Sequence, residues 1–398
     1  MKILFLHEVN YLAKPIFEMH EFPEYLATLG HEVGFMHFPE DVRCADLQSI
    51  PRVRKISGRV LENVEITLFT PRVPYGGLLG RLVAAIRYVW ETRTILEDFR
   101  PDVVVTYSVP TSGWQMVRQC NRLGIPVMYR AIDASHKIRR NIFSPLVRIA
   151  EIYVASRATH VSVHNSAMRE YVIRLGAKPE HVSNQFPIIR LIGDGGNAKS
   201  REGLREELGI PSSSNVLVFM GTFFPFAGLK EVIRAFSEEL NGEDYLLLIG
   251  DGGIRSDLER EVRALELESR VIFTGIIPFE KLRAYLQVGD VAINPFKSVS
   301  ATNVALPNKV LQYMAAKLPV VSTKLRGLAF LEILGAPGFL TVDKPEETIA
   351  EAFELVRSGA DLRSLGQKNF ETISELLDPD RALHEFERQL RTLAGKAL

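Results

Sequence analysis

The feature that most constrains the fold is an alternation of short apolar runs with helix-length segments, which begins at the N-terminus and begins again near residue 215. In the first half, the runs that predict strands are Lys2–Leu6, Glu32–Phe38, Val64–Phe69, Asp102–Tyr107, Pro126–Ala131 and Thr159–Val163. Strands that alternate with helices favour a parallel sheet with both faces covered, and buried strands of this kind are short and rich in Val, Ile and Leu. The first half is therefore predicted to be one α/β domain.

The second half repeats this arrangement after a Gly-rich polar stretch, residues 189–200, that is typical of a linker. Its predicted strands are Val216–Gly221, Tyr245–Gly253, Arg270–Gly275, Asp290–Phe296 and Leu318–Thr323. We expect two Rossmann-like, doubly wound α/β domains, residues 1–190 and 191–379, that face each other across a cleft lined by the carboxyl ends of the strands. The last helix, within residues 380–398, would pack back on the first domain or lie on the second. A length of 398 residues agrees with two domains.

Composition narrows the class of protein. Lys plus Arg and Asp plus Glu number 48 each, so nothing favours nucleic-acid binding, which usually needs a basic field. Neither of the two cysteines, Cys44 and Cys120, has a nearby partner that would indicate a disulfide or a zinc site. The N-terminal apolar run is too short for a secretory signal, and no apolar run is long enough to span a bilayer. We expect a cytoplasmic protein and leave peripheral contact with the inner membrane face open.

Three glycine turns follow three predicted strands of the second half, at Gly221-Thr222, Gly250 and Gly275. Glycine at such a turn lets the backbone approach a ligand without a Cβ in the way. Three of them around one cleft would suit a nucleotide, although ordinary strand-to-helix turns would give the same pattern.

The segment LPNKVLQYMAAKLPVV predicts a second feature of the same edge. Pro307 and Asn308 indicate a helix start, whose free backbone N–H groups would form an anion site. Cations are disfavoured near a helix N-terminus, so Lys309 in the first turn indicates a bound anion unless it is a solvated surface lysine. Gln312 lies about one turn further on the same face. A phosphate near Lys309 and a ribose hydroxyl near Gln312 would fit this spacing.

These segments together resemble a known family. In chain order they are FMGTFFPFAGLKEVIRAF, LLLIGDGG, VIFTGIIPFEKLRAYLQVGDVAINPF and PNKVLQYMAAKLPVVST, and they look like the donor-binding half of retaining GT-B glycosyltransferases, in particular family 4 (group 1). The resemblance covers about residues 200 to 345 and is weaker in the first half, where LGHEV and VSVHNSAMREYV carry it. It implies metal-independent transfer of a hexose, with retention, from a nucleotide diphosphate sugar and without a further cofactor.

The resemblance also implies roles for individual residues. Gly221 and Thr222 would line the diphosphate, Gly250 would lie near the nucleotide, residues from Phe273 to Ile276 would border the base, and Gln312 would hold the ribose. The full donor-binding set that we expect is Gly221, Thr222, Lys230, Gly250, Phe273, Ile276, Lys297, Asn308, Lys309, Val310 and Gln312. No residue is expected to bind a metal.

The sequence departs from the family at charged positions. Where the family often has Arg and Lys after the first strand of this half, this chain has Thr222 and Ala227. Another cation must then neutralise the diphosphate, and the candidates are, in order, Lys309, Lys230 and Lys297. The family's paired glutamates, eight positions apart, are replaced by Val304 and Gln312.

In the first half we expect the acceptor and catalytic groups. His20 and Glu21, in a segment after the first strand, are the candidate acceptor-binding residues, with a solvated helix start as the alternative. Asp133 and His136 follow a strand at its carboxyl end and are the candidate catalytic residues, with a plain surface loop as the alternative. A basic run with apolar residues between, Lys137, Arg139, Arg140 and Arg148, would touch anionic lipid or a phosphate-bearing acceptor unless it is a solvated helix face.

The sequence therefore predicts a glycosyltransferase of polysaccharide biosynthesis that uses a nucleotide-sugar donor and a glycan or lipid-linked acceptor. A nucleotide-sugar epimerase or hydrolase on the same fold is one alternative, and a non-catalytic nucleotide-sugar binding protein is another. An NAD-dependent oxidoreductase would need a GxGxxG turn, which Gly250-Asp251-Gly252 does not complete. The nucleotide, the sugar, the acceptor and the oligomeric state are left open.

Overall fold

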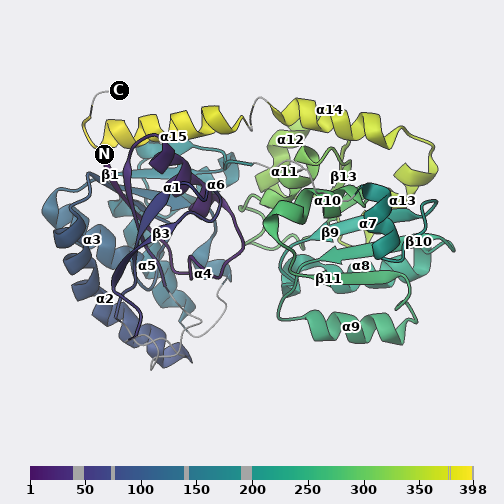
Figure 1. Ribbon diagram of the computed structural model, residues 1–398, viewed down its shortest axis with the longest axis horizontal. Helices are drawn as coiled ribbons and strands as arrows, with labels where there is room; N and C mark the ends of the chain where they lie inside the picture. The colour runs from purple at the N-terminus through teal and green to yellow at the C-terminus, as the bar shows by residue number, and fades with distance from the viewer. Residues whose placement is uncertain are drawn as a thin grey trace. The chain divides into compact units, whose positions relative to one another are not determined.

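The computed structural model describes residues 1–38, 49–72, 77–138, 143–189, 200–374, 376 and 378–396 (Figure 1). The chain divides into two compact units, Met1–Ile188 with Pro379–Leu398, and Ile189–Asp378. The domain boundary predicted between residues 190 and 191 lies outside the described residues. Each unit is built around its own sheet.

The sheet of the first unit has eight strands in the order β3-β4-β2-β1-β5-β6-β7-β8. The strands are β1 (Lys2–Leu6), β2 (Glu32–Met36), β3 (Val53–Ser57), β4 (Glu65–Phe69), β5 (Val103–Thr106), β6 (Val127–Ala131), β7 (His160–Val163) and β8 (Val182–Asn184). All neighbours pair in parallel except β3, which runs antiparallel to β4. From β4 to β8 the order is that of a doubly wound sheet, as the sequence predicts.

Helices cover both faces of this sheet. They are α1 (Glu18–Thr28), α2 (Gly77–Phe99), α3 (Gly113–Leu123), α4 (Ser135–Ile138), α5 (Ser144–Arg157), α6 (Ser166–Arg174) and α15 (Pro379–Leu393). Helices α1 and α15 pack on each other and enter one buried cluster with β1, β2, β4 and β5. Helix α3 packs against both α2 and α5. Since crossovers between parallel strands are right-handed, α2, α3 and α5 lie on the face opposite α1.

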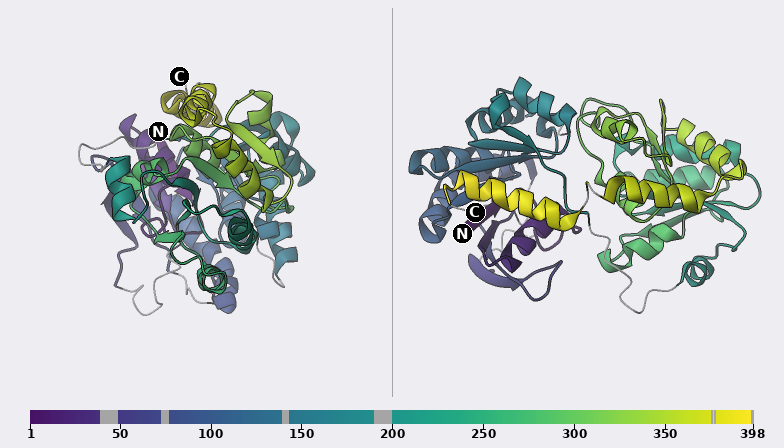
Figure 2. Two further views of the ribbon diagram at one scale, coloured as in Figure 1. Left: turned by 90° about the vertical axis from the view of Figure 1, so that its right-hand side faces the viewer. Right: turned by 90° about the horizontal axis from the view of Figure 1, so that it is seen from above.

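The C-terminal helix α15 belongs to the first unit, although the sequence left both units open (Figure 2). The ring centroid of Phe386 lies 4.2 Å from that of Phe22 and 6.5 Å from that of Phe5. Just beyond the helix, Lys396 Nζ lies 2.9 Å from a carboxylate oxygen of Asp102. Aromatic packing and an ion pair therefore hold the C-terminal segment on the sheet of the first unit.

The sheet of the second unit has six parallel strands in the order β11-β10-β9-β12-β13-β14. They are β9 (Asn215–Met220), β10 (Asp244–Ile249), β11 (Val271–Gly275), β12 (Val291–Asn294), β13 (Val320–Thr323) and β14 (Phe339–Val342). The helices are α7 (Arg201–Glu207), α8 (Leu229–Glu239), α9 (Arg255–Ala264), α10 (Leu282–Gln287), α11 (Asn308–Ala315), α12 (Ala329–Ile333), α13 (Glu347–Arg357) and α14 (Leu362–Ser374).

This strand order is that of a Rossmann-like sheet, and it reverses direction between β9 and β12. In open α/β sheets, ligands bind outside the carboxyl ends of the strands at such a switch point. The fold therefore directs attention to the residues that follow β9 and β12, and the glycine turns after β9, β10 and β11 lie at the same edge of the sheet.

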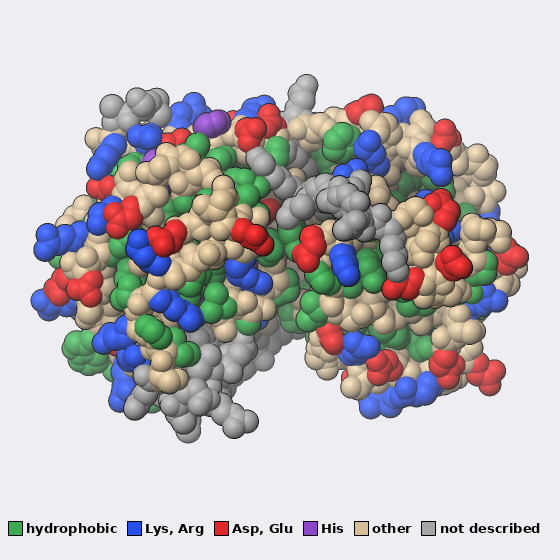
Figure 3. Space-filling view, viewed as in Figure 1, with side chains coloured by type: hydrophobic (Ala, Val, Ile, Leu, Met, Phe, Trp, Pro, Cys, Tyr) green, Lys and Arg blue, Asp and Glu red, His purple; other side chains and the backbone are tan. Residues whose placement is uncertain are grey.

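Surface charge and cysteine burial can be compared with the composition. Figure 3 shows Lys and Arg side chains interspersed with Asp and Glu over the face in view. Cys120 is buried, and Cys44 lies outside the described residues. None of the described helices is both long and apolar enough to cross a bilayer.

Candidate functional site

The three predicted glycine turns lie side by side at the carboxyl edge of the second sheet. Gly221 follows β9, Gly250 follows β10 and Gly275 ends β11, and their φ angles are 138°, 130° and 70°. The Gly250 N–H donates to the Gly275 carbonyl over 3.0 Å, and a Cβ on Gly250 would come within 2.2 Å of the Gly221 carbonyl oxygen. Glycine is therefore required by both backbone conformation and close approach.

Lys309 lies against this edge in an unusual environment. Its Nζ is 4.1 Å from the ring centroids of both Phe219 and Phe296. The nitrogen is buried and has no hydrogen-bond partner among the described residues. Burial holds the pKa of this ammonium well below its usual range. A Cβ on Gly221 would stand 2.7 Å from Nζ, so the glycine leaves room for the lysine tip.

Helix α11 fixes Lys309 in this position. The Tyr313 hydroxyl accepts a hydrogen bond from the Met220 N–H over 2.7 Å and so ties the helix to the end of β9. Val310 and Leu311 are fully buried on the inner side of the helix. Val310, predicted to contact the donor, therefore presents no side-chain surface, and its N–H donates to the Pro307 carbonyl over 2.9 Å. Its role in the structure is to pack α11 on the sheet.

The start of α11 offers further polar groups. The helix begins at Asn308 with Pro307 before it and without a side-chain cap. The Asn308 Oδ1 atom is buried and has no hydrogen-bond partner among the described residues. Gln312, one turn later, is half-buried. Lys309 and Asn308 thus present two buried, unsatisfied polar atoms at one helix start, which is the place where the sequence predicts an anion.

The other predicted lysines are already paired. Lys297 Nζ lies 2.6 Å from a carboxylate oxygen of Glu231, and Lys230 Nζ lies 3.3 Å from one of Glu261. Both ammonium groups are partly exposed, so solvent screens them as well. Lys297 and Lys230 therefore have acceptors within the protein, whereas the Lys309 ammonium has none among the described residues.

The remaining predicted donor residues border the glycine turns. Thr222 is exposed, and Ile276 is 73% exposed beyond the end of β11. Phe273 is half-buried, with the Arg255 guanidinium 5.8 Å from its ring centroid. The exposed Ile276 side chain lies in the segment that the resemblance assigns to the base.

An aromatic pair in the loop after β9 was missed by the sequence reasoning. Phe224 is 44% exposed and stacks on Phe226, with ring centroids 5.0 Å apart and planes at 20°. Phe226 in turn meets Phe296 edge to face, and Phe296 contacts Lys309. The signal was the run FFPF directly after Gly221-Thr222, since exposed aromatics in a glycine loop are a binding feature.

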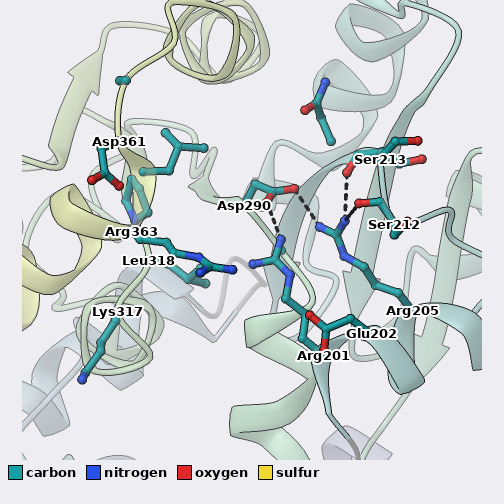
Figure 4. A pocket seen from close by; sticks show the side chains of 16 residues that line it. Arg201, Glu202, Arg205, Ser212, Ser213, Asp290, Lys317, Leu318, Asp361 and Arg363 are labelled. Atoms are coloured by element: carbon teal, nitrogen blue, oxygen red, sulfur yellow. Dashed lines mark hydrogen bonds and ion pairs between the residues drawn. The ribbon is translucent and has the colours of Figure 1, made fainter.

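The described cavity of the second unit lies at the opposite edge of the sheet (Figure 4). It has about 450 Å³ and is lined by residues at the amino ends of β9, β12 and β13. Here Asp290 pairs with both Arg201 and Arg205 and also accepts the Val216 N–H over 2.8 Å. The single Asp290 carboxylate thus binds two guanidinium groups of α7 and a backbone N–H of β9, so these residues fasten α7 to the sheet.

The first unit contains a buried charge cluster that the sequence reasoning also missed. Arg130, fully buried in β6, donates to both carboxylate oxygens of Glu18 over 2.9 and 3.1 Å. His164 Nε2 lies 2.8 Å from Glu18 as well. Burial alone would raise the pKa of Glu18, but Arg130 and His164 hold it well below its usual range. The pairs join α1 to the ends of β6 and β7, and the signal was an arginine inside an apolar strand.

The predicted catalytic residues lie at the carboxyl end of β6. His136 Nδ1 is 2.7 Å from a carboxylate oxygen of Glu151 and 3.0 Å from the Tyr171 hydroxyl. Asp133 is exposed at the surface of the first unit. Partial loss of hydration raises the pKa of this carboxyl group to about 6, and the negative charges of Glu18 and Glu151 add to the effect. Glu151 orients the imidazole, as a carboxylate does in many acid–base pairs.

The predicted acceptor residues are not at the surface. His20 is fully buried, its Nε2 lies 2.8 Å from the Tyr11 carbonyl oxygen, and its Nδ1 accepts the Phe17 N–H over 3.3 Å. Burial lowers the pKa of this imidazole to about 4, so it is neutral at pH 7. Glu21 is 4% exposed. The geometry does not support an acceptor role for either, because the first turn of α1 faces the segment before it.

The predicted basic run is described in part. Arg139 and Arg140 lie outside the described residues. Lys137 Nζ lies 4.8 Å from the Tyr171 ring centroid, and Arg148 is exposed on α5. Among the described residues, no group of three or more His, Cys, Asp or Glu is placed to hold a metal ion.

Comparison with known proteins identifies the class. Residues 19–183 match the family model of the glycosyl transferase 4-like domain, and residues 214–358 match that of the group 1 glycosyl transferases. The chain belongs to the group 1 glycosyltransferases and has their GT-B fold of two Rossmann-like domains.

Individual proteins of this class are similar over shorter or more distant stretches. The putative teichuronic acid biosynthesis glycosyltransferase TuaC of Bacillus subtilis (strain 168) is 28% identical over 150 residues, which are 37% of this chain and 35% of TuaC. The chain thus matches only about a third of that relative's length. Sucrose-phosphate synthase from Thermosynechococcus elongatus has a TM-score of 0.79 at 18% identity, covering 98% of each chain. Anabaena Alr3699/HepE, solved in complex with UDP-glucose, has a TM-score of 0.75 at 16% identity, covering 98% of this chain and all of that one.

Proposed function

We propose that this protein is a glycosyltransferase that binds a nucleoside diphosphate sugar at the carboxyl edge of the second sheet. The observation that carries this proposal is the buried Lys309 ammonium, which lies beside Gly221 with no acceptor of its own. The diphosphate supplies that acceptor. The family match, and the UDP-glucose complex of the similar Anabaena protein, support the choice of ligand.

Charge development explains why these groups suit the reaction. A nucleoside diphosphate leaves readily only if its growing negative charge is stabilised. Lys309 supplies a positive charge in a site of low polarity, and the free N–H groups at the start of α11 supply dipoles. In this proposal the chain's own groups neutralise the leaving group without a metal ion. Gln312, on the next turn, hydrogen-bonds the ribose.

The first unit supplies the candidate groups for the acceptor. With a pKa of about 6, Asp133 is ionised at pH 7 and accepts a hydrogen bond from an acceptor hydroxyl. His136 is held by Glu151 through Nδ1, which leaves Nε2 to face a ligand. We infer transfer of a hexose with retention to a glycan or lipid-linked acceptor in polysaccharide biosynthesis. The family membership and the name of TuaC motivate this inference.

A donor-binding experiment tests the proposal. Thermal-shift and calorimetric titrations with UDP, GDP, ADP and TDP and their sugars identify the nucleotide, because a bound ligand raises the melting temperature. Lys309→Met should weaken the best ligand roughly 10- to 100-fold, since a hydrogen bond to a charged group is lost. Lys281→Ala, at an exposed lysine of the same unit, is the matched control. Equal affinity of Lys309→Met and the control would refute the phosphate site.

Two alternatives, a non-catalytic binding protein and an epimerase, are motivated by one observation. Thr222, Ala227 and Val304 are uncharged at positions where the family often has charged residues. A transferase releases nucleoside diphosphate only when an acceptor is added. An epimerase changes the sugar without an acceptor, and a binding protein retains the intact donor in both conditions. Chromatography of the nucleotide pool separates the three.

Asp133 gives a prediction with a pH signature. Asp133→Asn should lower kcat by roughly 100-fold and leave the donor Kd unchanged. Since only the ionised form accepts the proton, wild-type activity should fall as the pH drops through about 6. That inflection should be absent from the residual activity of Asp133→Asn. A variant with the wild-type pH profile would remove Asp133 from the mechanism.

A further inference from the structure

Helix α2 presents a continuous apolar stripe to solvent. Leu82, Ile86 and Trp90 follow one another at intervals of four residues and are 37%, 62% and 63% exposed. Residues four apart lie on the same side of a helix, so these side chains form one strip, with Val83 beside it. Single exposed apolar residues are ordinary, but a tryptophan and three aliphatic side chains on one strip are not.

Helix α5 carries a second stripe on the same layer of helices. Leu146, Ile149 and Ile152 are spaced by three residues and are 56%, 63% and 39% exposed. Helix α3 packs against both α2 and α5 and therefore lies between these two helices. The buried sides of all three helices face the sheet, so the stripes and the exposed side of α3 form one outer surface, here called the α2–α3–α5 face.

The middle of this face is basic. Arg118 and Arg122 are exposed one turn apart on α3, and neither has an ion-pair or hydrogen-bond partner among the described residues. Arg87 on α2 and Arg148 on α5 are likewise exposed and unpaired among those residues. The carboxylates of the same helices are largely occupied, because Glu91 pairs with Arg52, Glu97 pairs with Arg93 and Glu151 is buried against His136. The face therefore carries an excess of positive charge between two apolar stripes.

We propose that the α2–α3–α5 face docks on the surface of an anionic lipid bilayer. Tryptophan and aliphatic side chains enter the boundary between headgroups and acyl chains, and the arginines remain at the level of the anionic headgroups. A second copy of this chain fits less well. In a symmetric dimer through this face, the central Arg118 and Arg122 of both copies would meet like charges. The inference stands on the first unit alone and does not depend on the proposed function.

Vesicle binding of the full chain tests the proposal. Wild-type protein should sediment with vesicles that contain phosphatidylglycerol in phosphatidylcholine and much less with phosphatidylcholine alone. Arg118→Gln with Arg122→Gln should lower the partition coefficient on anionic vesicles roughly 20-fold, since each arginine near an anionic surface contributes about a factor of five. Arg263→Gln with Arg363→Gln, exposed arginines of the second unit, changes the net charge equally and should leave binding near the wild-type value.

A second pair of variants tests the apolar stripes. Ile86→Ser with Ile149→Ser should abolish binding to anionic vesicles, whereas Ile333→Ser, at a residue of the second unit that is 84% exposed, should not. Tryptophan emission should shift to the blue on addition of anionic vesicles, and Trp90→Phe should lose that shift. Unchanged melting temperatures show that the variants fold. Absent vesicle binding of the wild type, equal losses in face and control variants, or a dimer that Ile86→Ser with Ile149→Ser dissociates would each overturn the proposal.

Discussion

Two buried cations of the second unit, at opposite edges of one sheet, differ in what surrounds them. Arg205, at the amino edge, donates to the carbonyl oxygens of Val288, Ser212 and Ser214 and to the carboxylate of Asp290. Lys309, at the carboxyl edge, has two aromatic faces and no hydrogen-bond acceptor among the described residues. The first cation has its acceptors within the protein, while the second has none among the described residues, and we propose that a ligand supplies one.

The free-energy cost of burying an unpaired charge explains why this difference is informative. A buried charge without a partner is expensive, and a protein ordinarily pairs it or neutralises it. The lowered pKa of Lys309 is that neutralisation. A buried ionisable group with a strongly shifted pKa often marks a functional site. Lys309 is such a group, and it lies at the switch point of the sheet beside three glycine turns. The cavity beside Arg205 (Figure 4) contains a cation whose hydrogen-bond acceptors all lie within the protein.

The largest effect should follow removal of the paired cation. Arg205→Met removes the guanidinium donor to three carbonyl groups and leaves Asp290 with only Arg201 and the Val216 N–H, and we expect a loss of about 3–5 kcal/mol in the free energy of unfolding. Arg201→Met, which removes the more exposed partner of Asp290, should cost about 1 kcal/mol or less. Urea denaturation measures both. Equal losses would show that burial and complete bonding do not distinguish Arg205.

Replacing the unpaired Lys309 should change the free energy of unfolding in the opposite direction. Lys309→Met keeps the length of the side chain and removes a buried amine that has no hydrogen-bond partner among the described residues, so the free energy of unfolding should rise by about 1–2 kcal/mol. The folded-state pKa is below the unfolded one, so the unfolded wild type binds an extra proton and its stability rises with pH toward the usual lysine pKa. The advantage of Lys309→Met should therefore shrink as the pH increases above 7. A destabilised variant would mean that Lys309 has an acceptor within the protein.

A smaller effect should come from crowding the lysine tip. Gly221→Ala places a Cβ 2.7 Å from Nζ at a φ of 138°, so both the lysine and the turn must shift. We expect donor affinity to fall roughly tenfold, about 1.4 kcal/mol. Gly253→Ala, where a Cβ would meet no atom within 4 Å, is the control. Calorimetric titration compares the two, and a wild-type Kd for Gly221→Ala would separate this turn from the phosphate site.

Much of the fold could be predicted from local sequence patterns. Apolar runs and glycine turns located most strands of both sheets. Strand β3 was missed because Val53–Ser57 alternates half-buried with exposed residues at a sheet edge and has no continuous apolar run. Strands β8, with three residues, and β14, with four, were also missed, because such short runs carry little periodicity.

The site was predictable only where one segment carries it. Asn308, Lys309 and Gln312 lie on one helix, as their spacing predicts, and their role in donor binding stays a prediction. The Glu18–Arg130 pair joins residues 112 positions apart, which periodicity does not reveal. His20 was predicted to bind the acceptor but is buried. Its position at a helix start does not reveal which side of the helix will pack against a neighbouring segment. Partners of buried charges are decided by tertiary packing, and only the structure shows that Lys309 has none.

Proton uptake on donor binding tests the central claim most directly. An anion beside Lys309 raises the pKa of its ammonium back toward the usual value, so binding of the preferred nucleoside diphosphate should draw a proton from solution at pH values between the lowered pKa and the usual lysine pKa. Calorimetry in two buffers of different ionisation enthalpy measures the number of protons. We predict uptake by the wild type and by Lys281→Ala, and none by Lys309→Met at saturating ligand. The same proton count in all three proteins would contradict the account.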